Sequence, residues 1–127
     1  MNKEDKELLL RDLCNRLPYN VMCQVEFKED GKYNSKVMLL SGIFTDEAYF
    51  TTKGGSIYSN EYKPYLFPLQ SMTEEQKQEY QHITERWMYD SSYSISDSID
   101  WLNVHHFDYR GLIENGLAID ATKLNIY

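Results

Sequence analysis

The stretch VMCQVEFKEDGK, residues 21–32, decides the fold class of this chain. Apolar and polar side chains alternate from Val21 to Lys28, which is the two-residue period of a strand with one buried face. Asp30 and Gly31 then stand at the centre of a turn, and Asp-Gly is a dipeptide that favours a tight hairpin. The sequence therefore predicts a β-hairpin here, with an antiparallel sheet built outward from it.

Further short strands follow the hairpin at close spacing. We expect a second strand over about residues 36–44, a third over 48–52, and a fourth that starts at Ile57 after a Gly54–Gly55 turn. Short strands joined by tight turns are typical of an antiparallel meander or a small, partly closed barrel. The second strand is apolar on both faces, so each face should be covered by a helix.

A helix of about Lys3 to Arg16 precedes the strands, with Asn2 as its N-cap and Pro18 beyond its end. We expect this helix to cover one face of the sheet. Its apolar stripe has the spacing of a 3.6-residue period and consists of Leu10, Leu13, Cys14 and Leu17.

The C-terminal half is predicted to be mainly helical. Two prolines in Lys63–Leu69 predict a connector that leaves the sheet, because proline removes ladder donors. Thr73 and Gln76 form a capping box for a helix that runs to about Met88 and should cover the second face of the sheet. A third helix is expected from about Ser96 to His106, followed by a short helix capped by Asp108.

Together these elements predict an α+β fold in one domain over residues 1–127. It has an N-terminal helix, a small antiparallel sheet or partly closed barrel of four to five strands, and C-terminal helices. Residues 1–62 would hold the first helix and the β meander, and residues 63–127 the mainly helical part.

The net charge of the chain argues against two classes of partner, nucleic acids and membranes. Among 127 residues there are 20 acidic and 13 basic ones, a net charge of −7. Surplus negative charge disfavours direct nucleic-acid binding and adsorption to anionic membranes, so we expect neither partner. The N-terminus lacks the apolar core of a signal peptide and no stretch is long enough to span a membrane, which predicts a cytoplasmic location.

The two cysteines, Cys14 and Cys23, have no Cys or His neighbours at zinc-site spacing. We expect both to be small buried hydrophobic residues, with free thiols in a reducing compartment. No metal ligand, catalytic residue or cofactor is therefore assigned.

The adjacent pair His105-His106 is the strongest candidate for chemistry. Neighbouring residues on a helix point apart, so the pair does not form a zinc face of the kind that needs an i, i+4 spacing. The alternative function is nevertheless a small metal-dependent hydrolase or nuclease that uses His105 or His106 with nearby Asp residues. Asp100 points away from His105 on the same helix, so further metal ligands would have to come from elsewhere, such as His82 or Asp108. An acidic mimic of nucleic acid is a third hypothesis.

Tyrosine is the one compositional excess, with 11 residues against 5 Phe and 2 Trp. That is more than a small core can hide, and Tyr is enriched at recognition surfaces. We therefore expect a protein partner or self-association. The predicted binding surface consists of Trp101, His105, Tyr109 and Arg110.

Two stretches carry a resemblance, KPYLFPLQSMT (residues 63–73) and DWLNVHHFDYRGLIENGLA (residues 100–118). They resemble a family of small uncharacterised proteins from gut Bacteroidales, their phages and mobile elements, which read KPYLRPLSSMT and DWLNxHHFDYRGLIEKGLA there. This chain departs from that pattern at Phe67, Gln70 and Asn115. The resemblance covers the C-terminal half, implies a bacterial or phage origin, and brings no activity with it. The leading prediction is a non-enzymatic protein-binding or regulatory module of phage or mobile-element origin.

Overall fold

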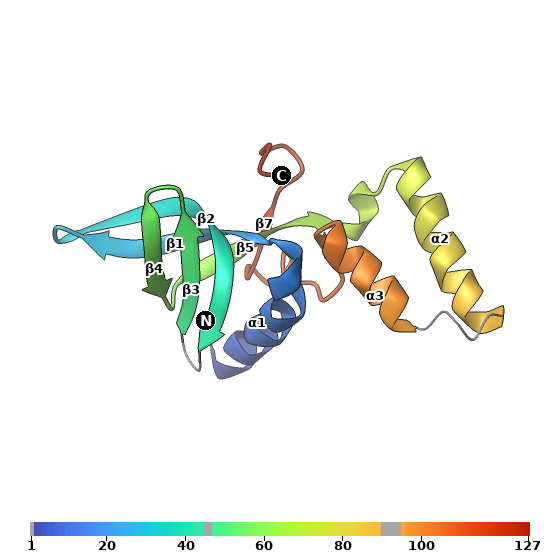
Figure 1. Cartoon of the computed structure of the whole chain (residues 1–127), viewed down its shortest axis with the longest axis horizontal. Helices are drawn as coiled ribbons and strands as arrows, with labels where there is room; N and C mark the ends of the chain where they lie inside the picture. The colour runs from blue at the N-terminus through green and yellow to red at the C-terminus, as the bar shows by residue number, and fades with distance from the viewer. Residues whose placement is uncertain (1, 45–46, 90–94) are drawn as a thin grey trace.

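A computed structural model describes residues 2–44, 47–89 and 95–127 of the chain (Figure 1). Helix α1 (Lys3–Arg16) and the 3₁₀ turn η1 (Leu17–Tyr19) lead into five strands, β1 (Met22–Glu29), β2 (Lys32–Phe44), β3 (Glu47–Thr52), β4 (Gly55–Ser59) and β5 (Tyr62–Pro68). The remaining elements are the 3₁₀ turn η2 (Leu69–Ser71), α2 (Glu74–Tyr89), α3 (Ile95–Val104) and the short strands β6 (Phe107–Asp108) and β7 (Ile119–Asp120).

The strands form one open, mixed sheet in the order β4-β3-β2-β1-β5-β6, with β7 also paired to β5. Strands β1 to β5 pair in antiparallel fashion, whereas β6 and β7 run parallel to β5. The α+β class with an N-terminal helix and C-terminal helices is confirmed. The prediction of a purely antiparallel sheet of four to five strands is wrong, because the C-terminal segment returns to add β6 and β7.

The first hairpin forms as its sequence predicts. Asp30 and Gly31 both have left-handed backbone conformations, with φ of 52° and 77°. Such a turn twists in the same sense as its strands, which holds Glu29 opposite Lys32. The alternation then directs Val21, Cys23 and Val25 into the core, where each is fully buried.

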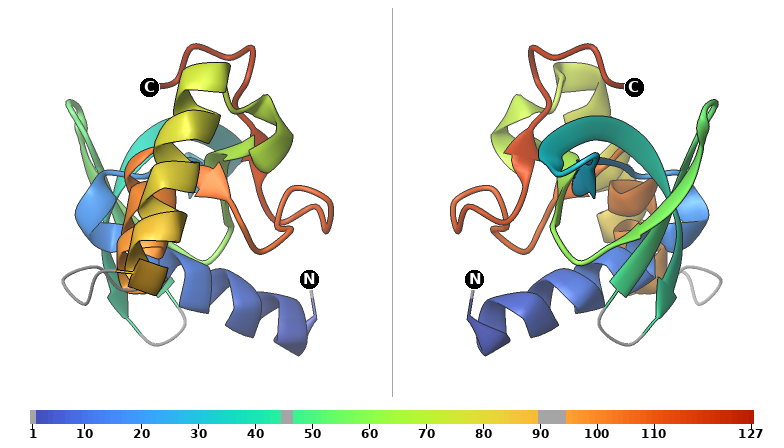
Figure 2. Two further views of the ribbon diagram at one scale, coloured as in Figure 1. Left: turned by 90° about the vertical axis from the view of Figure 1, so that its right-hand side faces the viewer. Right: turned by 90° about the vertical axis from the view of Figure 1, so that its left-hand side faces the viewer.

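The sheet does not close into a barrel. An irregularity between Leu40 and Gly42 bends β2, so that the β3–β4 hairpin and the β1–β2 hairpin point in different directions (Figure 1; Figure 2, right). The two hairpins meet where the Ser59 Oγ donates to the Glu26 carbonyl at 2.8 Å. Beyond that contact β1 and β4 diverge, which corrects the expected partial closure.

The proline-containing segment 63–69 is not a connector outside the sheet. It forms most of β5, which pairs with β1, then β7, then β6 along its length. Glu26 N–H donates to the Glu61 carbonyl, which makes Glu26–Glu61 a hydrogen-bonded pair of the β1–β5 ladder. Hydrogen-bonded pairs alternate with non-hydrogen-bonded ones, so Cys23–Pro64, three residues along, is a non-hydrogen-bonded pair. Pro64 therefore removes no donor from the β1–β5 ladder, and that is why the strand tolerates it.

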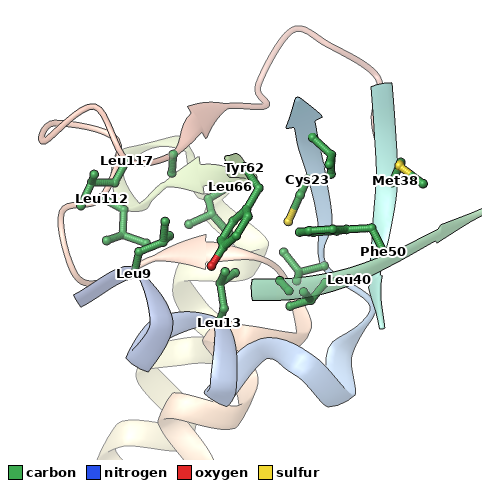
Figure 3. Close-up of a cluster of buried hydrophobic side chains, with 14 residues drawn as sticks. Leu9, Leu13, Cys23, Met38, Leu40, Phe50, Tyr62, Leu66, Leu112 and Leu117 are labelled. Atoms are coloured by element: carbon green, nitrogen blue, oxygen red, sulfur yellow. The ribbon is translucent and has the colours of Figure 1, made fainter. Parts of the chain in front are cut away.

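Helix α1 packs on the sheet, but it is rotated relative to its predicted stripe. Its buried side chains are Leu9, Asp12, Leu13 and Arg16, and Cys14 is exposed. The prediction that both cysteines are buried therefore holds only for Cys23, because burial of the charged Asp12 and Arg16 turns Cys14 outward. Figure 3 shows the main core between α1, the sheet and the C-terminal segment.

Helices α2 and α3 lie beside the end of the sheet rather than over it (Figure 1). The predicted capping box opens α2: Gln76 N–H donates to Thr73 Oγ1, and Thr73 N–H to Gln76 Oε1. Tyr80 and Ile83 of α2 pack into a second core around Trp101 of α3. The expectation that α2 covers the sheet is wrong, since β5 and η2 carry the chain past the sheet before α2 begins. None of the helices within the described ranges is long and apolar enough to cross a membrane.

Candidate functional site

The structure places the four predicted binding residues in two adjoining clusters. Trp101 is only 8% exposed, and its ring lies between those of Tyr80, His105 and Phe107. The Trp101 and His105 ring centroids are 4.3 Å apart. His105, Tyr109 and Arg110 are half-buried. Trp101 therefore supports this region from within, and the other three residues reach its surface.

Tyr109 and Arg110 belong to a buried charge cluster that joins α1 to the C-terminal segment. Asp12 and Arg16 form an ion pair with Nε and Oδ2 2.6 Å apart, and both side chains are fully buried. Arg16 also donates to the Phe107 carbonyl at 2.7 Å and lies over the Tyr109 ring. The Arg110 Nε lies 3.3 Å from Asp12 Oδ1. A salt-bridged core of this kind fixes the position of α1 against β6.

Burial dominates the electrostatics of this cluster. Desolvation raises the pKa of Asp12 above its ordinary value, and it outweighs the attraction of Arg16 and Arg110, which acts in the opposite direction. The contact between Asp12 Oδ1 and Arg110 Nε is an ion pair without hydrogen-bond geometry. Neither of these atoms, nor Arg16 Nη1, has a hydrogen-bond partner among the described residues. The arrangement is that of a structural ion network with one member, Arg110, reaching solvent.

The two histidines diverge, as adjacent residues were expected to do. Helix α3 ends at Val104, and His106 has a left-handed backbone with φ of 61°. His105 faces Trp101, whereas the His106 ring lies against Tyr127. Burial, followed by the charges of Arg16 and His105, lowers the pKa of His106 to about 4. His106 is therefore neutral near pH 7 and is poorly suited to accept a proton there.

The carboxylate predicted to assist these histidines is engaged in backbone contacts. Asp108 accepts hydrogen bonds from the N–H groups of Arg110, Leu112 and Ile113, as its predicted capping role requires. The segment that it caps forms turns and not the expected short helix, and it ends at left-handed Gly116. Within the described part of the chain, no three His, Cys, Asp or Glu side chains gather as a metal site would need. No observation favours the hydrolase hypothesis.

The outer face of β2, β3 and β4 carries an aromatic patch, formed by Phe44, Tyr49 and Tyr58. Ring centroids of Phe44 and Tyr58 are 5.8 Å apart, and those of Tyr49 and Tyr58 are 4.9 Å apart. Phe44 is 55% exposed and Tyr58 is 59% exposed. Gly42 lies opposite Tyr49 and adds no side chain to separate the rings.

The tyrosine excess is visible in the sequence, but the sequence does not single out this patch. The alternation in β3 contained the missing signal, since Ala48 and Phe50 point to the core and Tyr49 points away. Tyr58 lies directly opposite Tyr49 on β4, so it shares that outward face. What the sequence did not reveal is that none of the helices in the described ranges covers this face.

A hollow that we term the hairpin cleft opens between the two hairpins, with a volume of about 300 Å³. Its apolar lining comes from Phe27, Met38 and Ile57, and the turn at Gly54–Gly55 forms one wall. Lys36 lines the same cleft, with Nζ 6.0 Å from the centre of the Phe27 ring. Lys28 and Glu29 line it as well, so the hairpin cleft combines an apolar floor with two lysines and one carboxylate.

Comparisons with known proteins add no assignment: no family model, no curated protein and no solved structure matches this chain.

Proposed function

We propose that this chain is a non-enzymatic protein-binding or regulatory module of phage or mobile-element origin, and that the aromatic patch is its main contact surface. The observation that carries the proposal is the exposure of Phe44 and Tyr58, in contact with Tyr49, on a sheet face that the described helices leave uncovered. Clustered aromatic rings are typical of the anchors that dominate protein interfaces.

The chemistry of the patch suits a protein partner. A tyrosine ring offers a large contact area at low entropic cost, and its hydroxyl can meet a polar group at the rim. The chain as a whole carries a net charge of −7, whereas Phe44, Tyr49 and Tyr58 are uncharged. One carboxylate, that of Glu47, lies opposite Phe44 at the edge of the patch, so a partner would meet uncharged rings beside a single negative charge.

The residues predicted from the sequence remain a proposed second contact. His105, Tyr109 and Arg110 keep part of their surface exposed, and Arg110 offers a planar cation beside an aromatic ring at 5.2 Å. Trp101 would act by positioning His105 from beneath.

Affinity capture from a Bacteroidales lysate treated with nuclease tests the proposal. The wild type is compared with the double variant Phe44→Ser/Tyr58→Ser. The matched control is Ile95→Ser/Leu124→Ser, which changes two other exposed apolar residues. We expect one stoichiometric partner that the control retains and the patch variant loses.

Two outcomes would contradict the proposal. The first is that no partner is captured and light scattering shows a monomer. The second is that the patch variant captures the same partner as the control, to the same extent.

A further inference from the structure

Strand β4 is an outer strand of the sheet, and one of its edges has no partner strand among the described residues. Every residue of β4 lies opposite a residue of β3. Because a two-residue turn joins Thr52 to Gly55, the hydrogen-bonded pairs of this ladder are Thr52–Gly55 and Phe50–Ile57. In antiparallel pairing the intervening residues point the other way, so the N–H and C=O groups of Ser56 and Tyr58 face outward. They form a template for one more strand.

This edge lacks the features that usually protect an outer strand. Natural edge strands often carry Lys or another charged residue, or a proline, and these prevent pairing with another chain. Strand β4 reads Gly-Ser-Ile-Tyr-Ser and contains neither a charge nor a proline. The edge is therefore open to main-chain pairing.

A second unpaired edge lies across from β4. Glu26 N–H points toward β5, and Lys28, two residues on, points the same way but lies beyond the β1–β5 pairing. The hairpin cleft lies between this end of β1 and β4. A further hollow of about 400 Å³ is lined by Lys28 and Tyr58 together with three carboxylates, those of Glu26, Glu47 and Glu61, so an acidic side chain fits the hairpin cleft and not this second hollow. The gap between the two strands is thus hollowed at more than one place.

We infer that the partner is an extended segment of another protein, which pairs with the outer edge of β4 and directs alternate side chains into the hairpin cleft and toward the aromatic patch. This inference rests on the proposed function and specifies its binding mode. Strand addition of this kind obtains affinity from main-chain hydrogen bonds and specificity from pockets for alternate side chains.

The lining of the cleft defines the chemistry of that segment. Phe27, Met38 and Ile57 favour an apolar side chain on the inward face of the added strand. No carboxylate of the described residues lies within 4.0 Å of Lys36 Nζ, so an Asp or Glu beside the apolar residue would complete an ion pair. The segment should therefore combine apolar and acidic residues.

A second copy of this chain fits the site less well. Pairing of β4 with another β4 would bring the segment Gly55–Ser59, which contains no carboxylate to meet Lys36. The net charge of −7 on each copy also opposes their association. We therefore assign the site to a different protein.

Selection from a phage-displayed library of random twelve-residue peptides on the full chain tests this inference. Enriched peptides are synthesised, and their Kd is measured by fluorescence polarisation. Ser56→Pro removes the outward N–H at an edge position where proline is tolerated, and Ser56→Thr retains it. Lys36→Glu reverses the charge in the cleft, and Lys123→Glu makes the same charge change at an exposed residue that lines no part of it.

We expect enriched peptides that combine apolar and acidic residues. Ser56→Pro and Lys36→Glu should each raise Kd by roughly tenfold, the effect of one lost hydrogen bond or ion pair, and the two control variants should leave it within roughly twofold. In the wild type, bound peptide should slow hydrogen exchange at Ser56 and Tyr58. That measurement does not depend on how well Ser56→Pro folds.

Three results would overturn the inference: no enriched peptide, no slowing of exchange at Ser56 and Tyr58, or a dimer of this chain that alone occupies the edge. Loss of binding on Phe44→Ser/Tyr58→Ser, without any loss on Ser56→Pro or Lys36→Glu, would retain the proposed function. It would also reject strand addition.

Discussion

Tyr127 stacks face to face on His106, with ring centroids 3.7 Å apart and planes 12° apart. The Tyr127 hydroxyl accepts a hydrogen bond from Met22 N–H and donates one to the Tyr65 carbonyl. The same side chain therefore contacts residues next to α3, at the start of β1 and within β5. Its ring also lies 5.9 Å from that of Phe67, which packs against the second core around Trp101, so Tyr127 joins that core to the sheet.

Protonation of His106 should destabilise the fold. Its pKa is about 4 in the folded chain against an ordinary 6.5, so between these values the unfolded chain binds a proton that the folded chain does not. The stabilising contribution is fully present above about pH 6.5, and it is lost as pH falls toward about 4. Urea denaturation at several pH values should show this loss for the wild type.

His106→Asn is the variant that isolates this effect, since Asn tolerates the left-handed backbone at position 106. Its free energy of unfolding should fall less steeply than that of the wild type over the same pH range. The matched control is His82→Asn, which changes an exposed histidine on α2. Equal slopes for His106→Asn and the wild type would show that His106 is not the titrating group.

Loss of Arg16 should be strongly destabilising. Arg16→Leu leaves the fully buried Asp12 carboxylate with only the longer contact to Arg110, and it leaves the Phe107 carbonyl without its donor. We expect the free energy of unfolding to fall by about 3–5 kcal/mol in urea denaturation. The double variant Asp12→Leu/Arg16→Leu should recover part of this loss, because it removes both charges.

Arg11→Leu is the matched control for this pair, since Arg11 is exposed on the same helix. It should change stability by no more than about 0.5 kcal/mol. If the Arg16→Leu and Arg11→Leu variants unfolded at the same urea concentration, the network would have no stabilising role.

Alanine substitutions at the two adjacent glycines of the β3–β4 turn should differ in their cost to stability. Gly55 has φ of +142°, a conformation that side chains rarely adopt, whereas no positive φ is found at Gly54. No atom lies within 4 Å of the Cβ position at either residue, so crowding is not a factor. Gly55→Ala should cost about 1–3 kcal/mol in thermal or urea denaturation, and Gly54→Ala less than about 1 kcal/mol. Equal losses would refute the assigned turn.

The free edge of β4 should be detectable by hydrogen exchange in the isolated chain. The amides of Ser56 and Tyr58 point away from β3, whereas Ile57 pairs with Phe50. Hydrogen exchange monitored by NMR should therefore be at least about tenfold faster at Ser56 and Tyr58 than at Ile57. Slow exchange at Ser56 and Tyr58 in the isolated chain would mean that the edge is already covered.

Local signals in the sequence determined several elements correctly. The helix Lys3–Arg16 with its Asn2 cap, the Asp30–Gly31 hairpin and the Thr73–Gln76 capping box all form as predicted. Each depends on contacts between residues a few positions apart. The chain itself therefore contains all the information that such elements need.

Only the tertiary structure decided the rest. The rotation of α1 that buries Arg16 depends on the Phe107 carbonyl, which is 91 residues away in sequence. The strand at 62–68 depends on β1, β6 and β7, and the exposure of Phe44 and Tyr58 depends on where α2 comes to lie. Periodicity shows which side chains share a face, but only the packing of distant segments determines whether that face is covered.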